Sequence, residues 1–317
     1  MIMNMNRVLV KLTRGMSGSS PSNVRGRRVM EYTRKTAVIT GAASGLGLGI
    51  ARACAARNMK LVLADINRNR LDEIGQEFSN AGVEVLTRAA NVAEVDDMER
   101  LAHLTFERFG AVHLLFNNAG VLGESSLLDA MLKDWEWIMG VNLWGVINSI
   151  RAFVPRMLES GEPGRVVNIA GTAGFLSGPG VSIYRMTKHA VVSLSESLYH
   201  ELTDSSVQVS LVSPAFVKTE IMAAEKNRPP NMQCFARTKI ANPVEEAVLG
   251  FFQQQVETAP DPEVVAEAIF SGIDQNKFYI FAPPLAKDQP NRAWIQTRMD
   301  NIVEERNPVF AGKNWPV

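Results

Sequence analysis

Short apolar runs alternate along this chain with segments whose apolar residues recur at helical spacing. The runs predict strands at 37–40, 60–65, 83–87, 112–116, 165–169, 207–212 and 278–281. The helical spacing predicts helices at about 45–57, 68–80, 94–109, 135–160, 182–204, 262–274 and 292–305. Strands that are apolar throughout and alternate with helices are typical of a parallel sheet covered on both faces. We therefore expect an α/β fold built on a doubly wound, seven-stranded parallel sheet.

The domain organisation follows from where this pattern starts, loosens and stops. Residues 34–284 are expected to form a single domain, and 285–317 a C-terminal helical extension. The stretch 219–255 contains several prolines and has no strong period, so it is expected to be irregular. Residues 1–33 are basic, with no acid before Glu31, and are expected to be a disordered extension. An organelle transit peptide has a similar composition and is the second interpretation.

The composition of the chain excludes several classes of protein. Lys plus Arg and Asp plus Glu number 33 each, so the formal net charge is zero and no nucleic-acid partner is expected. No apolar run reaches transmembrane length, so no membrane span is expected. Cys54 and Cys234 give neither a disulfide framework nor metal-ligand spacing. We therefore expect no metal site and a reduced, cytoplasmic environment.

A glycine cluster stands between the first predicted strand and the first predicted helix. Gly41, Gly45 and Gly47 permit a tight turn and a close approach of the backbone to a pyrophosphate at the helix N-terminus. Asp65 ends the second strand, where an acid can bind the ribose hydroxyls of an adenosine. Together these residues predict a dinucleotide site in a Rossmann-type fold.

The coenzyme preference depends on the charges beside that ribose. Asp65 would repel a 2′-phosphate, so NAD(H) is favoured over NADP(H). Arg68 and Arg70 follow closely and are the argument for NADP(H), although solvated charges on a helix face explain them more simply. NADP(H) therefore remains possible.

The segment that begins at Tyr184 carries a candidate for acid/base chemistry. Tyr184 and Lys188 stand at positions i and i+4, so they share one face of a helix. A nearby ammonium favours the phenolate, so we expect Lys188 to lower the pKa of Tyr184. Such a tyrosine can serve as a general acid or base near neutral pH.

Three motifs together resemble the short-chain dehydrogenase/reductase family. They are the turn Thr40–Gly47, the segment Asn117–Gly120 and the pair Tyr184 and Lys188. The resemblance implies an oxidoreductase that moves hydride between nicotinamide and a carbonyl, alcohol or imine of a small-molecule substrate. It also implies that Tyr184 is the acid/base, that Lys188 binds the nicotinamide ribose, and that Asn142 supports a water beside this lysine.

The same resemblance assigns the residues that bind the cofactor. Asn91 stands where the family usually has an aspartate against the adenine, and its amide oxygen can accept the same bond. Val217 would bond the carboxamide, and Ala215 replaces a family glycine, which puts the local backbone geometry in question. The full set is Gly41, Ser44, Gly45, Leu46, Gly47, Asp65, Asn91, Val92, Asn117, Asn118, Ala119, Gly120, Tyr184, Lys188, Pro214, Val217 and Thr219.

Gly171 departs from the family pattern. It stands thirteen residues before Tyr184, where the family has a serine that donates a hydrogen bond to the substrate oxygen. Losing such a donor can cost about 2.7–4 kcal/mol in the transition state. Thr172 or Ser182 are candidates to replace it, and Ser177 is a poorer one. The objection to Thr172 is that adjacent residues on an extended chain point opposite ways.

Gly171 is also compatible with two further interpretations. The substrate needs no serine, or the chain is a redox-inactive or non-redox protein that binds a nucleotide or small molecule. We rank an oxidoreductase with altered carbonyl activation first, because Tyr184, Lys188 and Asn142 are present. On this interpretation, Gly171→Ser is expected to raise kcat/KM on simple ketones.

The substrate and the assembly are implied only in outline. The resemblance implies that residues 219–260 form a lid, and apolar residues around it favour an apolar or aromatic substrate. These are Leu122, Phe175, Leu176, Phe216, Ile221, Met222, Met232 and Phe235. Residues 134–145 and 153–157 show a weaker similarity to bacterial lignin-type Cα-alcohol dehydrogenases. Relatives pair through the helices that carry Asn142 and Tyr184, which implies a homodimer or homotetramer.

Overall fold

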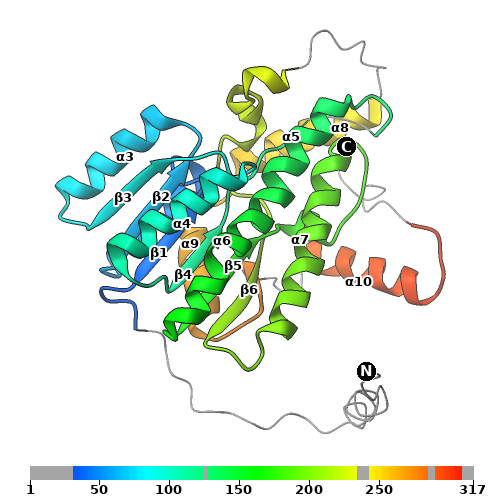
Figure 1. Cartoon of the computed structure of the whole chain (residues 1–317). Coiled ribbons are helices and arrows are strands. Elements are labelled where there is room, and N and C mark those ends of the chain that lie inside the picture. Colours follow the sequence, from blue (N-terminus) through cyan, green and yellow to red (C-terminus); the bar gives the residue numbers. More distant parts are fainter. Residues whose placement is uncertain (1–30, 124–126, 234–242, 285–289, 309–317) are drawn as a thin grey trace, which may run out of the picture. The chain divides into compact units, whose positions relative to one another are not determined.

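Parallel strands form the centre of the structure. The computed structural model describes residues 31–123, 127–233, 243–284 and 290–308 (Figure 1). Its sheet has the order β3-β2-β1-β4-β5-β6-β7, with every neighbouring pair parallel. The strands are β1 (Thr36–Thr40), β2 (Lys60–Asp65), β3 (Val85–Ala89), β4 (Leu114–Asn117), β5 (Gly164–Ile169), β6 (Val207–Pro214) and β7 (Tyr279–Ala282). The predicted doubly wound, seven-stranded parallel sheet is confirmed. Its order reverses between β1 and β4, and ligands of such sheets bind at the carboxyl ends of the strands there.

Helices cover both faces of the sheet, so its apolar strands are buried. On one face, α4 (Val95–Phe109) and α6 (Gly145–Ser160) share a core cluster with the strands, and α7 (Ser182–Glu201) lies beside α6 (Figure 1). Elsewhere, α2 (Gly45–Ala56) packs on α9 (Pro262–Asp274), so closely that a Cβ at Gly49 would lie 2.7 Å from the backbone of Pro262. Helix α3 (Arg68–Asn80) connects β2 to β3.

The helix predicted over 135–160 ends where predicted, but it starts three residues earlier and is not a continuous α-helix. It begins as α5 (Leu132–Met139), passes through a π-helical turn (Gly140–Trp144) and continues as α6. The early start has a local cause, because the Asp134 carboxylate accepts the backbone N–H of Met131 at 2.9 Å. Inserted π-helical turns occur often at functional sites, and this one contains Asn142.

The region after β6 contains more regular structure than its sequence indicates. Two 3₁₀ turns, Ile221–Asn227 and Pro230–Met232, precede a helix that the sequence pattern does not predict, α8 (Pro243–Glu257). The apolar residues of α8 lack a clean helical period, so only the proline at its first position signals its start. Residues 234–242, with Cys234 and Phe235, lie outside the described ranges, as do residues 1–30 of the predicted N-terminal extension. The final helix, α10 (Pro290–Val303), corresponds to the one predicted at 292–305.

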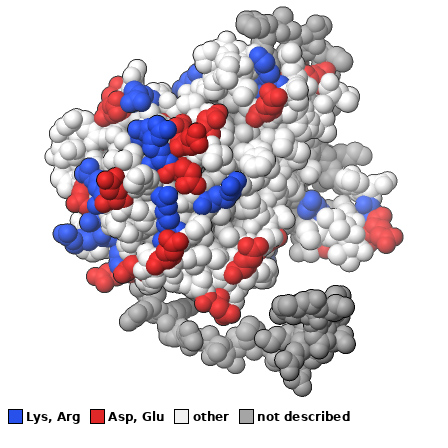
Figure 2. Space-filling view, viewed as in Figure 1, with Lys and Arg blue, Asp and Glu red and all other residues white. Residues whose placement is uncertain are grey.

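The surface carries both signs of charge. Figure 2 shows lysine and arginine interspersed with aspartate and glutamate on the visible face, with no large field of one sign. Within the described ranges, none of the helices has the length and hydropathy needed to cross a membrane. Cys54 is fully buried.

Candidate active site

A cavity of about 780 Å³ contains most of the predicted site residues. It is lined by residues from the glycine turn, the ends of the strands and the segment after β6. The predicted cofactor residues on its wall are Gly41, Ser44, Gly45, Leu46, Asp65, Asn91, Val92, Asn118, Ala119, Gly120, Tyr184, Lys188, Pro214, Val217 and Thr219. Gly47 and Asn117 are not on the wall.

The glycine turn is shaped by close approaches of backbone to backbone. Gly41 has φ 65°, and a Cβ there would lie 2.8 Å from Cα of Ala119. A Cβ on Gly47 would lie only 2.0 Å from the carbonyl oxygen of Gly41. Gly47 therefore lets the first turn of α2 pack on the glycine turn, and it does not face the cavity.

The N-terminus of α2 offers its backbone donors to the cavity. Ser44 precedes the helix but its side chain makes no capping hydrogen bond, and the first turn contains no acidic residue. The first backbone N–H groups of a helix have no partner within the helix, and they carry partial positive charge. This end of the cavity therefore suits a phosphate group.

Asp65 lies at the cavity wall with both carboxylate oxygens directed by the backbone. One oxygen accepts the N–H of Ala43 at 2.9 Å, and the other accepts that of Asn67 at 2.9 Å. Burial raises the pKa of Asp65, while these N–H groups act to lower it. Arg70 also reaches the wall but pairs with Glu73 at 2.7 Å.

The asparagines of Asn117–Gly120 divide into two kinds. The Asn118 amide donates to the carbonyl oxygens of Thr40 and Gly41 at 3.0 and 3.2 Å, so it ties this segment to the glycine turn. Asn117 is buried and donates to Asn168 at 2.7 Å, across the boundary between β4 and β5. Asn117, predicted to bind the cofactor, therefore does not line the cavity, because its side chain braces the sheet.

Asn91 lies on the wall with its side chain already engaged. Its side-chain amide oxygen accepts the backbone N–H of Ala93 at 3.1 Å. The backbone N–H of Asn91 donates to the Asp97 carboxylate at 2.9 Å. The amide oxygen keeps a second lone pair for another donor. Val92, Val217 and Thr219 also line the cavity, as predicted. Ala215 is not among the described residues with positive φ, so replacing the family glycine creates no strain.

Tyr184 and Lys188 meet on one face of α7, as their spacing predicts. The ammonium of Lys188 lies 5.6 Å from the ring centre of Tyr184 and donates to the carbonyl oxygen of Ile169 at 2.9 Å. The expected depression of the pKa of Tyr184 is wrong. Burial raises the pKa of Tyr184 to about 12, and burial lowers the pKa of Lys188 to about 8.

Asn142 is buried and does not line the cavity. Its side chain accepts the N–H of Val121 at 2.8 Å and donates to the carbonyl oxygen of the same residue at 2.9 Å. A Cβ on Gly120 would lie 3.4 Å from the Asn142 amide oxygen and 3.6 Å from the Lys188 nitrogen. The two side chains therefore lie close to each other at Gly120, with Asn142 fixing the backbone beside the lysine.

Gly171 has a backbone conformation that a serine does not readily adopt. Its φ is 79° and its ψ is 168°, in a region that is essentially restricted to glycine. There is room for a side chain, because a Cβ would meet only the Pro214 oxygen at 3.6 Å and the Ala173 nitrogen at 3.9 Å. The backbone, and not the available space, therefore opposes serine at this position.

Thr172 is the candidate donor that the structure places at the cavity. It lines the wall, while Ser182 does not, and Ser177 lies on the wall but is exposed. Gly171 and Thr172 do not lie on an extended chain, so the orientation of Thr172 is not set by strand alternation. Gly171 turns the chain with positive φ, and Thr172 begins a 3₁₀ turn.

The apolar wall agrees with the sequence in most positions. Leu122, Leu176, Phe216, Ile221, Met222 and Met232 line the cavity as expected. Phe175 does not, because it packs against Tyr279 and Phe281 with ring centres 6.3 and 5.9 Å away. Sequence reasoning missed Trp137 and Phe252, since the first lies before the π-helical turn and the second on the unpredicted α8.

A buried arginine also reaches this wall. Arg185 is 6% exposed, and its guanidinium lies 5.6 Å from the ring centre of Phe252. Burial lowers its pKa to about 10. No cluster of His, Cys, Asp and Glu that could hold a metal ion is found in the described ranges.

Comparison with known proteins identifies the family. The family model described as short chain dehydrogenase matches residues 35–230. A CLA biosynthesis dehydrogenase/reductase of Lactiplantibacillus plantarum is 30% identical over 288 residues, which are 88% of this chain and 96% of the relative. A C alpha-dehydrogenase of a Sphingobium species is 31% identical over 81% of this chain and 83% of its own.

A solved structure agrees with these sequence relatives. A short-chain dehydrogenase/reductase from Burkholderia phymatum, determined in complex with NAD, has a TM-score of 0.82 and 38% identity. The match covers 88% of this chain and 98% of that one. This chain therefore belongs to the short-chain dehydrogenase family and is an oxidoreductase of that type.

Proposed function

We propose that this chain transfers hydride between NAD(H) and the carbonyl or alcohol carbon of an apolar or aromatic substrate, with Tyr184 as the acid/base. One observation carries the proposal. A single cavity has the glycine turn and Asp65 at one end, and Tyr184 and Lys188 at the other. An imine substrate would use the same arrangement. A cytoplasmic location, expected from the cysteine content, and a homodimer or homotetramer, implied by the resemblance, remain predictions.

The residues of the cavity fit a nicotinamide dinucleotide. The uncapped N-terminus of α2 would hold the pyrophosphate, and Gly41 and Gly45 would let it approach the backbone. The carboxylate of Asp65 would accept hydrogen bonds from the ribose hydroxyls. It favours NAD(H) because it would repel a 2′-phosphate. Lys188 would bind the second ribose. When bound, the reduced coenzyme supplies the hydride for the carbonyl carbon.

Tyr184 moves the proton that accompanies this transfer. In reduction the neutral phenol donates its proton to the developing alkoxide, and in oxidation the phenolate accepts the proton of the alcohol. A pKa of about 12 keeps the phenol protonated at neutral pH, which suits the direction of reduction. The ammonium of Lys188 stabilises the phenolate whenever the lysine is protonated.

Thr172 supplies the hydroxyl that Gly171 lacks. Within the described residues its side-chain oxygen makes no hydrogen bond, so it is available to a substrate oxygen. The surrounding wall is formed by aromatic and aliphatic side chains, among them Trp137, Phe216 and Met222. This combination favours a carbonyl carried on an apolar or aromatic body.

A redox-inactive binding protein is the second candidate, because Gly171 itself offers no donor. The test is to mix the purified protein with NADH or NADPH and a panel of aryl ketones, diketones and imines. We expect oxidation of NADH with at least one class, and a lower Kd for NADH than for NADPH. Tight NADH binding without any oxidation would favour the second candidate. Tighter binding of NADPH would contradict the role of Asp65 and indicate Arg70.

A further inference from the structure

The 3₁₀ segment after β6 forms one wall of the substrate end of the cavity. Ile221, Met222 and Ala224 line the cavity before Arg228, and Pro229 and Met232 line it after. Ala224 and Met232 pack in a small apolar cluster with Trp137 of α5. We call residues 221–232 the lid segment. Its position relative to α5 therefore sets the shape of the substrate end.

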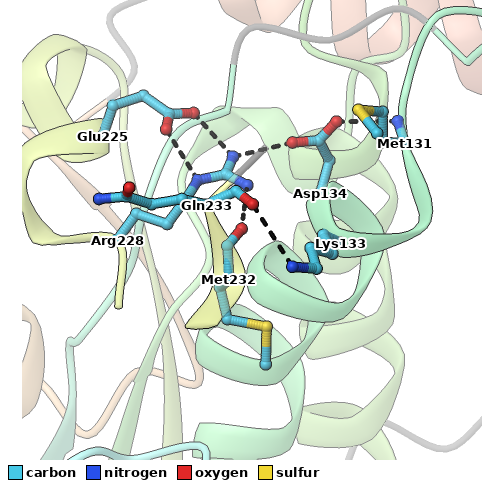
Figure 3. Close-up of polar contacts among 7 residues, drawn as sticks. All are labelled: Met131, Lys133, Asp134, Glu225, Arg228, Met232 and Gln233. Carbon is cyan, nitrogen blue, oxygen red and sulfur yellow. Dashed lines mark hydrogen bonds and ion pairs between the residues drawn. The ribbon is translucent and has the colours of Figure 1, made fainter. Parts of the chain in front are cut away.

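Arg228 joins the lid segment to α5 (Figure 3). Its guanidinium donates to the Asp134 carboxylate at 2.9 Å, and it donates to both oxygens of Glu225 at 2.8 Å. A third nitrogen donates to the carbonyl oxygen of Met232 at 3.2 Å. The guanidinium carbon also lies 4.1 Å from the ring centre of Trp137. One side chain thus binds the middle of the lid segment at Glu225, its end at Met232, and the helix that faces it.

The partner on α5 is fully buried. Asp134 has 0% exposure, and its second oxygen accepts the N–H of Met131, the residue that precedes α5. Burying an ion pair carries a desolvation cost, which makes it weak evidence for a purely stabilising role. The pair instead selects one geometry, because the carboxylate is fixed on α5 and the guanidinium is fixed on the lid segment.

We propose that the Asp134–Arg228 ion pair is a latch that holds the lid segment closed against α5, so that Arg228 is a positioning residue for the substrate. The proposal rests on the proposed function. Arg228 is followed and preceded by cavity-lining residues, Pro229 and Asn227, so releasing it displaces the wall directly. The coenzyme's adenosine end at Asp65 is formed by other elements and keeps its geometry.

Three variants separate a latch from a merely structural contact. Arg228→Met removes the guanidinium while the charge of the buried Asp134 remains, which lowers Tm. The double variant Asp134→Asn with Arg228→Met removes that charge as well, so Tm recovers while the lid segment stays unlatched. Arg57→Met is the matched control. Arg57 makes two 2.8 Å bonds to Glu267 and lies 4.0 Å from the ring centre of Phe270, away from the cavity wall.

Two readouts are measured on each variant. The first is hydrogen exchange of the backbone amides in residues 220–233, which reports opening of the lid segment without any substrate. The second is KM and kcat for the best carbonyl substrate, together with the Kd for NADH. We expect faster exchange and a KM raised about ten- to a hundred-fold in both Arg228 variants. The Kd for NADH should stay within about threefold, because the adenosine end is distant.

The outcomes separate the latch from the chemistry. If KM and amide exchange in the double variant match those of Arg57→Met, Arg228 is structural only and the latch is wrong. If KM recovers together with Tm, the proposal also fails. If no carbonyl compound is turned over by the parent, the proposed function fails, and the amide exchange alone then decides the latch.

Discussion

The two ends of the cavity differ in the groups that form them. At the coenzyme end, backbone groups make most of the contacts. Asn118 donates to the carbonyls of the glycine turn, and Asp65 accepts from two backbone N–H groups. At the substrate end, side chains from α5, α7, α8 and the lid segment meet, and Gly171 removes the usual hydroxyl. The coenzyme end therefore depends on the backbone of the fold, whereas the shape of the substrate end depends on individual side chains.

Removing the hydroxyl of Thr172 is expected to give the largest change at the substrate end. Thr172→Val keeps the shape and removes the donor, so kcat/KM for carbonyl reduction should fall about 10²–10³-fold, the usual cost of one oxyanion donor. The Kd for NADH should not change. Steady-state kinetics with Ser182→Ala as the control would check this, because Ser182 does not line the cavity. An equal effect of the two substitutions would remove Thr172 from the mechanism.

Gly171 tests whether the substrate end tolerates a return to the family residue. Gly171→Ser and Gly171→Ala both place a side chain at φ 79°, so each should lower the free energy of unfolding by about 1–3 kcal/mol in denaturant titrations. Comparing the two isolates the hydroxyl, since they share the backbone strain. A serine variant that is as stable as the parent, and more active than the alanine variant, would show that the chain relaxes to accept the donor.

The pH dependence tests the environment of Tyr184. Burial raises its pKa to about 12, so the neutral phenol persists throughout the neutral range. With NADH as the coenzyme, kcat/KM for reduction should be flat between about pH 6 and 9, while kcat/KM for alcohol oxidation with NAD⁺ should rise about tenfold per pH unit, because oxidation needs the phenolate. A fall in reduction above about pH 7, with oxidation level, would mean that the working pKa is near neutral.

The coenzyme end can be predicted from the sequence because its chemistry depends on local backbone geometry. Gly41 needs positive φ and a close approach to Ala119, and only glycine meets both conditions. The pair of Tyr184 and Lys188 is equally predictable, since helix spacing alone brings the two residues together. The error over the pKa of Tyr184 arises from burial, which a sequence does not display.

The substrate end is less predictable because its contacts join distant segments. Arg228 and Asp134 are 94 residues apart, and nothing in either local sequence indicates the pair. The π-helical turn and α8 escape prediction because neither has a regular apolar period. The sequence indicates Thr172 as a candidate, but the positive φ of Gly171 that brings it into consideration is a property of the folded chain.

The central claim is that Tyr184 transfers the proton in a cavity that binds NADH through other residues. The direct measurement compares Tyr184→Phe with the parent, recording NADH oxidation at saturating carbonyl substrate and the Kd for NADH on the same preparations. We expect a loss of turnover of about 10²–10⁴-fold, the usual contribution of general acid catalysis, with the Kd for NADH unchanged. Turnover that stays near the parent rate would contradict the claim.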